Sequence, residues 1–270
     1  MAPVKFDDIQ KVAGEVLNDD FQVSGHMLKT KQKAGSSTLS GQIDLFGDKA
    51  CQTPAKLTWK IPGPFGLGQV NVDKLEMDKG GKYKLELSSD KLCPVVKMEC
   101  RSDLADFNKV VVCGTYTGFK GALVKLETKP AKPMDFNGEV TVGCANATAG
   151  VKFSSALLSG GLPDVGLRYM KGPYFGAFLA KDKLSSYSAF CSYKATPEVK
   201  CAATGTYANK TPSFALAVAC KGLYKVKVTS DQAVLCSLKH TAAKGLTGLV
   251  GAKYNVKKGD WSYGVQLTVE

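Results

Sequence analysis

The chain has 270 residues, 44% of them hydrophobic, and a formal net charge of +12. It holds no run of about 18 apolar residues, which excludes a membrane-spanning α-helix, and its basic excess predicts an anionic partner or solute without specifying which one. The nine cysteines are scattered without a C-x-x-C pair. That pattern is typical neither of a disulfide framework nor of a zinc site, so we expect reduced thiols in an intracellular protein.

The first predicted element is an amphipathic helix within residues 1–20. Its apolar side chains recur three and four residues apart and share one helix face, whereas Asp7, Asp8 and Lys11 lie largely on the other. The apolar face comprises Ile9, Val12, Ala13, Val16 and Leu17. Two positions stay open for this helix: packed on an ordinary core, or inside a pore with its apolar face on the wall. The segment lacks a signal-peptide core, and its early aspartates disfavour a cleaved transit peptide.

From residue 21 onward, apolar and polar residues alternate with the period of a β-strand. In KYKLEL (82–87), for example, Tyr83, Leu85 and Leu87 share one face and the polar residues share the other. The same alternation recurs at 56–61, 96–100, 124–129, 224–228 and 250–256. Segmenting the chain at its turn signals gives roughly nineteen strands of about 9–11 residues, with poor alternation near 147–158 and 173–182.

Lysine dominates the polar face of these strands. We interpret these lysines, together with Lys11 of the helix, as lining a watery pore: Lys56, Lys60, Lys82, Lys84, Lys97, Lys125, Lys129, Lys200, Lys225, Lys227 and Lys253. Fewer acids fall on the same face, namely Glu86, Glu99, Glu127 and Glu198.

Two all-β architectures fit this alternation. A soluble sandwich of this length would have fewer and shorter strands, and its polar face would suit glutamate as well as lysine. A transmembrane β-barrel instead turns apolar side chains to lipid and polar ones to the lumen, and its closure pairs every backbone group. The pattern favours the barrel, with residues 1–20 as a helical segment and residues 21–270 as a barrel of about nineteen strands.

The last predicted strand is WSYGVQLTVE, from Trp261 to Glu270. Its apolar residues Tyr263, Val265, Leu267 and Val269 share one face. A terminal strand at an open sheet edge invites foreign pairing, so the sequence raises the question of what this strand pairs with.

Several stretches together resemble the eukaryotic porins, the voltage-dependent anion channels of the mitochondrial outer membrane. They are F-x-D-I-x-K from Phe6 to Lys11, MLKTKQKAG in the first strand, KLELSSD from Lys84 to Asp90, and the terminal YGVQLTVE. The likeness covers the whole chain as strand pattern and length. Nineteen is the strand number known for this family, so our strand count is not independent of the resemblance. Acidic Asp19 and Asp20 stand where the family often has a lysine.

The resemblance implies a barrel closed by parallel pairing of the first and last strands, here 21–31 with 261–269, and a helix inside the pore. It also implies a weak nucleotide contact at Lys11, Lys82 and Lys84. The family's C-terminal sorting signal, read by the outer-membrane assembly machinery, corresponds to Ser262, Gly264, Leu267 and Val269. The implied partners are outer-membrane lipid and anionic metabolites including nucleotides, and homo-oligomers stay open.

Two other functions remain open. The related protein-import pore shares the barrel but usually has a longer N-terminal extension and a more acidic lumen. A soluble basic β protein that binds nucleic acid or acidic lipid is disfavoured because Trp59, Tyr83 and Tyr224 lie opposite the lysines. With only His26 and His240, and no catalytic or dinucleotide-binding motif, we expect no metal, no cofactor, no nucleic-acid partner and no enzyme activity.

Overall fold

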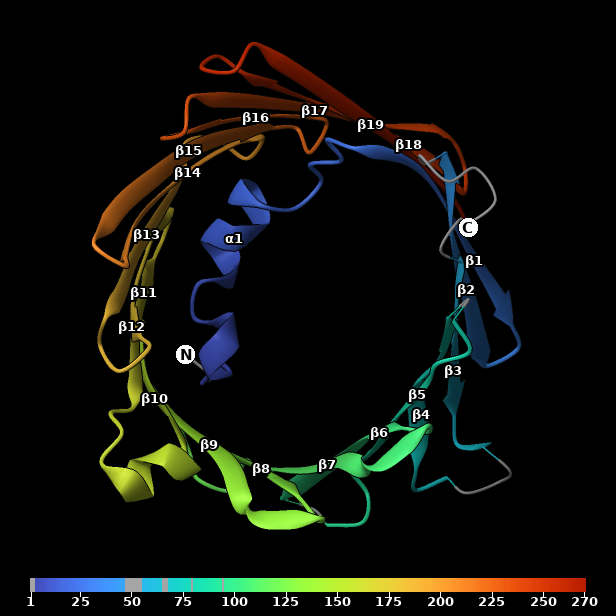
Figure 1. Cartoon of the computed structure of the whole chain (residues 1–270), viewed down its shortest axis with the longest axis vertical. Helices are drawn as coiled ribbons and strands as arrows, with labels where there is room; N and C mark the ends of the chain where they lie inside the picture. The colour runs from blue at the N-terminus through green and yellow to red at the C-terminus, as the bar shows by residue number, and fades with distance from the viewer. Residues whose placement is uncertain (1–2, 47–54, 65–67, 79, 94) are drawn as a thin grey trace.

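The fold is a closed β-barrel with a helix inside it (Figure 1). This computed structural model describes residues 3–46, 55–64, 68–78, 80–93 and 95–270. Within those residues, nineteen strands form a single sheet, which confirms the predicted fold and strand number. Cys51 lies outside the described residues, and the other eight cysteines are free thiols.

Successive strands are joined by short connections and pair as antiparallel neighbours. The strands are β1 (Gly25–Ala34), β2 (Ser37–Phe46), β3 (Ala55–Pro62), β4 (Asn71–Asp78), β5 (Tyr83–Ser89), β6 (Val96–Asp103), β7 (Asp106–Tyr116), β8 (Ala122–Lys129), β9 (Lys132–Cys144), β10 (Ala147–Ser154), β11 (Asp164–Lys171), β12 (Tyr174–Lys181), β13 (Ser186–Lys194), β14 (Val199–Ala208), β15 (Thr211–Cys220), β16 (Tyr224–Thr229), β17 (Ala233–Ala243), β18 (Leu246–Asn255) and β19 (Asp260–Val269).

The barrel closes where β1 pairs in parallel with β19, from Gly25 opposite Gly264 to Thr30 opposite Val269. This pairing answers the question raised by the terminal strand and confirms the predicted closure. The predicted start of the first strand at residue 21 is wrong. Residues up to Ser24 instead run along the inside of the sheet, where a Cβ on Gly251 would collide with the Gln22 carbonyl oxygen. Gly25 then turns the chain into β1 with φ +72°, a conformation that favours glycine.

The two faces of the sheet differ in chemistry. Direct cross-strand partners share a face, and side chains alternate along each strand, so the register assigns every strand residue to the inside or the outside. Large apolar side chains stand exposed on the outside, among them Trp59, Leu126, Leu167, Phe214, Leu216, Tyr263 and Leu267. A barrel in water would bury such a belt, whereas a barrel in a bilayer presents it to lipid.

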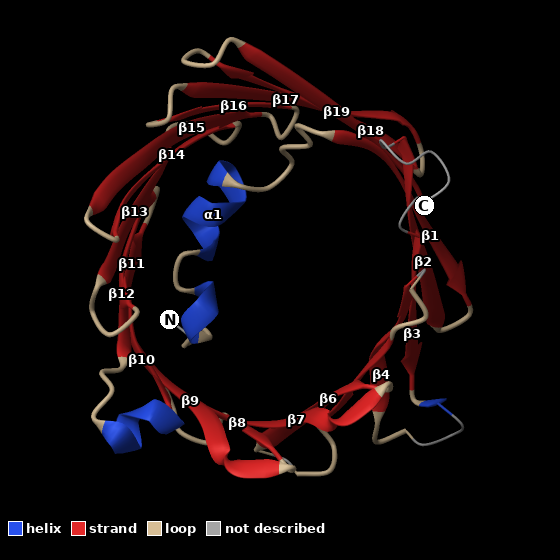
Figure 2. Cartoon of the chain, viewed as in Figure 1, coloured by secondary structure: helices blue, strands red, loops and turns tan. Residues whose placement is uncertain are grey.

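The N-terminal segment lies within the ring of strands (Figure 2). It contains a 3-10 turn, η1 (Phe6–Asp8), followed by the short helix α1 (Lys11–Leu17). None of the described helices is long and apolar enough to cross a membrane. Another 3-10 helix of the described residues, η3 (Ser155–Ser159), follows β10, which explains why the stretch near 155–158 lacks strand alternation.

Candidate functional site

The lumen is the candidate site, and the N-terminal segment divides its wall into two parts. η1 contacts β9 and β10, and α1 contacts β13, β14 and β15. Lysines of β16 and β17 bond the end of the helix. We call β9–β17 the covered wall and β1–β8 the open wall, while β18 and β19 carry the link that joins the helix to β1.

The covered wall is built from small and apolar residues that receive the helix. Phe6, Ile9 and Leu17 are almost completely buried. Facing them are Phe175, Leu179, Ala202, Ala215, Ala217 and Ala219. Burial of this apolar face against the wall is the main force that holds so short a helix, since an isolated helix of this length is not stable in water.

Two glycines let the segment approach the sheet closely. A Cβ on Gly166 would lie 2.7 Å from Ile9 Cδ1 and 3.1 Å from Phe6 Cε2, and a Cβ on Gly150 would lie 3.0 Å from Phe6 Cδ2. These distances are shorter than normal carbon contacts, so a side chain at either position pushes the N-terminal segment away.

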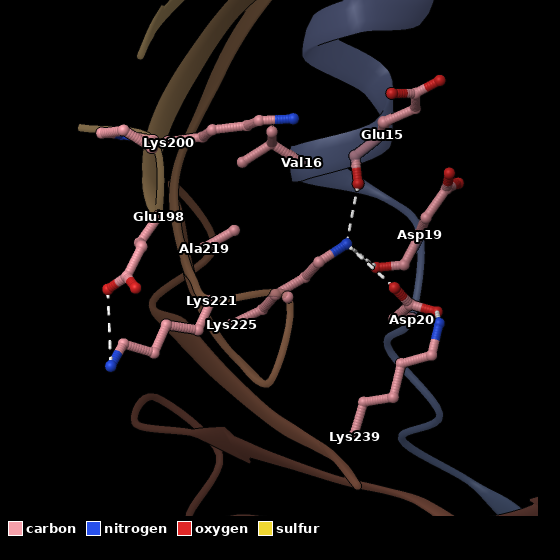
Figure 3. Close-up of a pocket in the computed structure, with 12 residues that line it drawn as sticks. Glu15, Val16, Asp19, Asp20, Glu198, Lys200, Ala219, Lys221, Lys225 and Lys239 are labelled. Carbon is pink, nitrogen blue, oxygen red and sulfur yellow. Dashed lines mark hydrogen bonds and ion pairs between the residues drawn. The ribbon is translucent and has the colours of Figure 1, made fainter. Parts of the chain in front are cut away.

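The C-terminal end of α1 is tied to the wall by lysines (Figure 3). Lys225 Nζ donates to the carbonyl oxygens of Glu15 at 2.9 Å and Asp19 at 3.2 Å. The last carbonyls of a helix lack partners within the helix and carry partial negative charge, so a lysine here satisfies them both electrostatically and by hydrogen bonding. Lys227 Nζ adds a bond to Asn18 Oδ1 at 3.3 Å.

Asp20 lies between two of these lysines. Its carboxylate is 3.2 Å from Lys225 Nζ and 3.1 Å from Lys239 Nζ. Partial burial works to raise the pKa of Asp20, but the hydrogen bonds and charges of Lys239 and Lys225 outweigh it and hold that pKa below its ordinary value. Beside this cluster a cavity of about 600 Å³ opens, lined by Glu15, Asp19, Asp20, Lys200, Lys225 and Lys239.

The open wall is polar and carries a ladder of ion pairs. Lys74 Nζ lies 2.6 Å from Glu76, Lys97 Nζ lies 3.1 Å from Glu99, and Lys125 Nζ lies 2.7 Å from Glu127. Arg101 bridges Glu99 and Glu127 at 3.2 Å and 3.6 Å. Lys5 at the start of the N-terminal segment reaches the same ladder, 3.8 Å from Glu99.

The twelve lysines predicted to line the pore fall into three groups. Six have a carboxylate within 4.0 Å: Lys11 with Asp8, Lys56 with Glu76, Lys97 with Glu99, Lys125 with Glu127, Lys129 with Asp135, and Lys225 with Asp20. Lys227 instead bonds the helix end. Among the described residues, no carboxylate lies within this distance of Lys60, Lys82, Lys84, Lys200 and Lys253.

Lys82 lies before β5, in the turn that follows β4, and not on a strand. Lys60, Lys84 and Lys253 lie on β3, β5 and β18. Lys11 lies on α1, which contacts β13, β14 and β15 of the covered wall, whereas Lys82 and Lys84 flank the first residue of β5 on the open wall. Glu198 lies in the turn before β14 and pairs with Lys221 at 3.4 Å.

Sequence reasoning missed several residues of the lumen wall. Lys74, Glu76, Arg101 and Glu139 lie on the inner face with the predicted lysines and glutamates, as their cross-strand partners show. Alternation through 96–103 and 132–144 was the signal that would have found Arg101 and Glu139. Lys239 on β17 and Arg168 on β11 are further omissions. The Arg168 guanidinium lies 5.6 Å from the centre of the Phe175 ring on the covered wall.

The residues of the C-terminal signal divide between the two faces of β19. Leu267 lies opposite Leu28 and Gly248, and Val269 lies opposite Thr30 and Leu246, on the outer face. Ser262 and Gly264 lie on the inner face, where Ser24 of the link passes so close that a Cβ on Gly264 would meet its backbone nitrogen at 2.7 Å.

No arrangement of three or more histidine, cysteine, aspartate or glutamate residues in the described part of the chain is able to hold a metal ion. Comparisons with models of known protein families and with curated proteins find no match to this chain.

Proposed function

We propose that this protein is a channel of the mitochondrial outer membrane, a divergent relative of the voltage-dependent anion channels. It passes small metabolites and ions with a weak preference for anions, including nucleotides, phosphate and carboxylates. The observation that carries the proposal is a closed barrel with an apolar outer belt and a lysine-rich inner wall that a short N-terminal helix lines on one side.

Weak anion preference is supported by the distribution of unpaired charge. The ladder on the open wall neutralises much of its own lysine charge, whereas Lys60, Lys84 and Lys253 have no close carboxylate in the described residues. Charges in a wide aqueous pore are screened within about 8–10 Å at physiological salt, so these lysines enrich anions near the wall without excluding cations.

A protein-import pore is the second candidate for the same barrel. Its substrates are basic presequences, which an acidic wall attracts and a lysine-rich wall repels. The inner face of β16–β18 carries Lys225, Lys227, Lys239 and Lys253, so the charge of this wall disfavours import.

The test is the zero-current potential of the purified protein in a planar bilayer under a salt gradient. The variant carries Lys60→Glu, Lys84→Glu and Lys253→Glu, three changes that break no ion pair of the described residues. We expect modest anion preference in the wild type, lost or reversed in the variant, with the pore still conducting. A matched control, Lys258→Glu in the turn between β18 and β19, should leave selectivity nearly unchanged.

Three outcomes would count against the proposal. The proposal would be refuted if the wild-type protein formed no channel, or if the wild-type channel preferred cations. Unchanged selectivity in the triple variant would show that these lysines do not face the conducting path. Carbonate extraction of membranes separately tests the soluble alternative, because an integral barrel resists extraction whereas a peripheral protein does not.

A further inference from the structure

A cavity of about 360 Å³ opens on the lumen side of β1–β3, at the seam with β19. These three strands lie on the side of the ring away from the N-terminal segment (Figure 1). The lining of the cavity includes two lysines, Lys29 and Lys56, and the neutral hydrogen-bond donors Ser40, Gln42, Thr58 and Thr268. The cavity therefore combines positive charge with uncharged donors, which is the chemistry of an anion site.

The register places these side chains in two neighbouring rows on the inner face. Direct cross-strand partners form the first row on β19, β1, β2 and β3, namely Thr268, Lys29, Gln42 and Lys56. In the second row, Thr58 lies between Ser40 and Glu76, the glutamate of the ladder. Cross-strand partners share a face, so all these side chains face the lumen.

The two lysines of the first row carry little compensating charge. Among the described residues, Lys29 has no carboxylate within 4.0 Å, and the nearest carboxylate to Lys56 is that of Glu76, at 4.0 Å. Other lysines hold the two carboxylates of the lining more closely: Lys74 lies 2.6 Å from Glu76, and Lys31 lies 3.1 Å from Glu270. Positive charge therefore remains at one place on the open wall.

The neutral donors of the cavity have no competing partners. The side chains of Ser40, Gln42 and Thr58 make no hydrogen bond to another group in the described part of the chain. Thr268 Oγ1 only accepts one, from Gln266 Nε2 at 3.3 Å. Since Gln42 lies between the two lysines in the row, an anion that bridges them passes directly over its amide N–H groups.

We propose that this cavity binds a diphosphate group, with one phosphate against Lys29 and the other against Lys56. Neighbouring strands lie about 4.8 Å apart, so these two lysines leave the wall roughly 10 Å from each other. A diphosphate spans more of that gap than a single phosphate does, and the long lysine side chains cover the rest. Lysine binds phosphate as a point charge, whereas a planar carboxylate is matched best by an arginine fork, which this lining lacks.

The site deepens the proposed function, on which it rests. It gives diphosphate-bearing solutes a place to pause on the open wall, away from α1. Lys56 is about half exposed, so water and salt weaken its attraction for an anion. Weak binding suits a conducting path, because a solute that binds tightly does not leave.

The test uses the unmodified chain, folded into phosphatidylcholine vesicles and labelled with a trace of acetic anhydride. Mass spectrometry gives the acetylation rate of each lysine with and without pyrophosphate, at constant ionic strength. Pyrophosphate should slow acetylation of Lys29 and Lys56 several-fold. It should leave Lys84 and Lys253, inner-face lysines of β5 and β18, nearly unchanged. Equal slowing at all four lysines would show diffuse attraction and overturn the proposal, as would the absence of slowing at Lys29 and Lys56.

Further ligands at the same ionic strength define the chemistry. If adenosine diphosphate protects both lysines as well as pyrophosphate does, the ligand is the diphosphate of a nucleotide. Protection by pyrophosphate without protection by adenosine diphosphate limits the site to free diphosphate. Inorganic phosphate and succinate should protect less than pyrophosphate. Equal protection by either one would overturn the assignment to a diphosphate group.

Paired variants test the same site through its affinity. Lys29→Gln with Lys56→Gln should weaken pyrophosphate binding several-fold, as measured by broadening of its phosphorus NMR signal in the presence of vesicles. Lys84→Gln with Lys253→Gln removes the same charge from the inner face elsewhere and should weaken binding much less. Equal weakening in the two variants would overturn the proposal.

Failure of the site and failure of the proposed function are distinguishable. A chain that protects Lys29 and Lys56 but forms no channel in a planar bilayer would refute the channel and keep the site. An anion-preferring channel in which pyrophosphate protects neither lysine would keep the channel and refute the site.

Discussion

The covered and open walls belong to one sheet and share its strand geometry, but their inward-facing residues differ in composition. Where the N-terminal segment packs on the covered wall, inward positions are small or apolar, as at Gly166, Ala202 and Ala217, because a helix occupies the space before them. On the open wall, inward positions carry lysines and glutamates in alternation, as at Lys97 and Glu99. The difference teaches that the inner face of a barrel strand need not be polar. It matches whatever lies in front of it, water or protein.

The largest effect is expected from a charge on the outer face of β19. Leu267→Lys places an ammonium group among lipid-facing side chains, and such a group costs about 2–4 kcal/mol near the middle of a bilayer. Gln266→Lys, one residue away on the inner face, should be mild. The measurement is the fraction of each variant that folds into vesicles, and equal folding would contradict the facing of this strand.

The next largest effect should follow from blocking the approach of the helix. Gly166→Leu fills the space now taken by Ile9 and Phe6, so the N-terminal segment should leave the covered wall while the barrel persists. Limited proteolysis of the segment should become several-fold faster, and channel recordings should show altered conductance and gating.

Gly176→Leu on the neighbouring strand is the matched control, because no atom lies within 4 Å of the position that its Cβ would occupy. If the N-terminal segment is cleaved equally fast in both leucine variants, the position of the segment does not depend on its close approach to Gly166. Deletion of residues 5–18 extends the test: a barrel should still form, whereas aggregation would mean that the helix belongs to the folding core.

A smaller effect is expected at the lysine that holds the end of α1. Lys225→Gln shortens the donor to the carbonyls of Glu15 and Asp19, and the loss of these part-buried hydrogen bonds costs about 1 kcal/mol each. Closing transitions should become more frequent. Lys60→Gln on the open wall should change ion selectivity without changing the frequency of closing. If Lys60→Gln altered closing and Lys225→Gln altered only selectivity, the assignment of gating to the covered wall and selectivity to the open wall would be wrong.

The pH dependence of the same anchor has a defined sign. Because the pKa of Asp20 is lowered by Lys239 and Lys225, its stabilisation is fully present above the ordinary carboxyl pKa of about 3.9 and is lost as pH falls through the lowered value. Because Asp20 stays ionised near neutral pH, its titration should not alter gating there and should change gating only in strong acid. Asp20→Asn should reproduce the acid behaviour at neutral pH. An Asp20-dependent change in gating between pH 5 and 7 would contradict this assignment.

The smallest effect is expected within the ladder. Glu99→Gln removes one carboxylate that Lys5, Lys97 and Arg101 share, and partly exposed ion pairs contribute no more than about 1 kcal/mol. Barrel stability in denaturant should barely change, while anion preference should rise slightly because three cations lose a partner. A large loss of stability would show that the ladder supports the open wall itself.

Alternation was sufficient to predict the barrel, because a period of two fixes the face of each residue once a strand is placed. The alternation was weakest in the part of the sheet that packs against the N-terminal segment. In β12, Phe175, Ala177 and Leu179 face inward and are apolar, so the strand reads as apolar on both faces and its alternation disappears. The loss of alternation marks strands of the covered wall. It does not identify them from the sequence, because the position of the helix is not known at that point.

The sequence predicted many of the residues that line the lumen, but not the partners that they bond. The sequence places Lys225 and Lys227 on the inner face, yet only the folded chain shows that they bond the helix end and not a solute. Contacts between residues 20 and 239 join distant parts of the sequence, and no local pattern signals them. The acid at Asp20, a position where the porins that the sequence resembles often have a lysine, is explained by its contacts with Lys225 and Lys239. Asp19 contributes only its backbone carbonyl oxygen to this cluster.

The parallel seam between β1 and β19 also determines when the barrel is able to form. Each strand presents unpaired backbone groups until the other arrives, and the two lie at opposite ends of the chain. The entropy of closing so large a ring grows only slowly with its length, so the final stability suffers little, but pairing of such distant segments is slow. The curled, unclosed sheet is therefore the aggregation-prone state of this protein. A factor that shields the β1 edge until β19 has been synthesised would raise the yield of barrels without changing their stability.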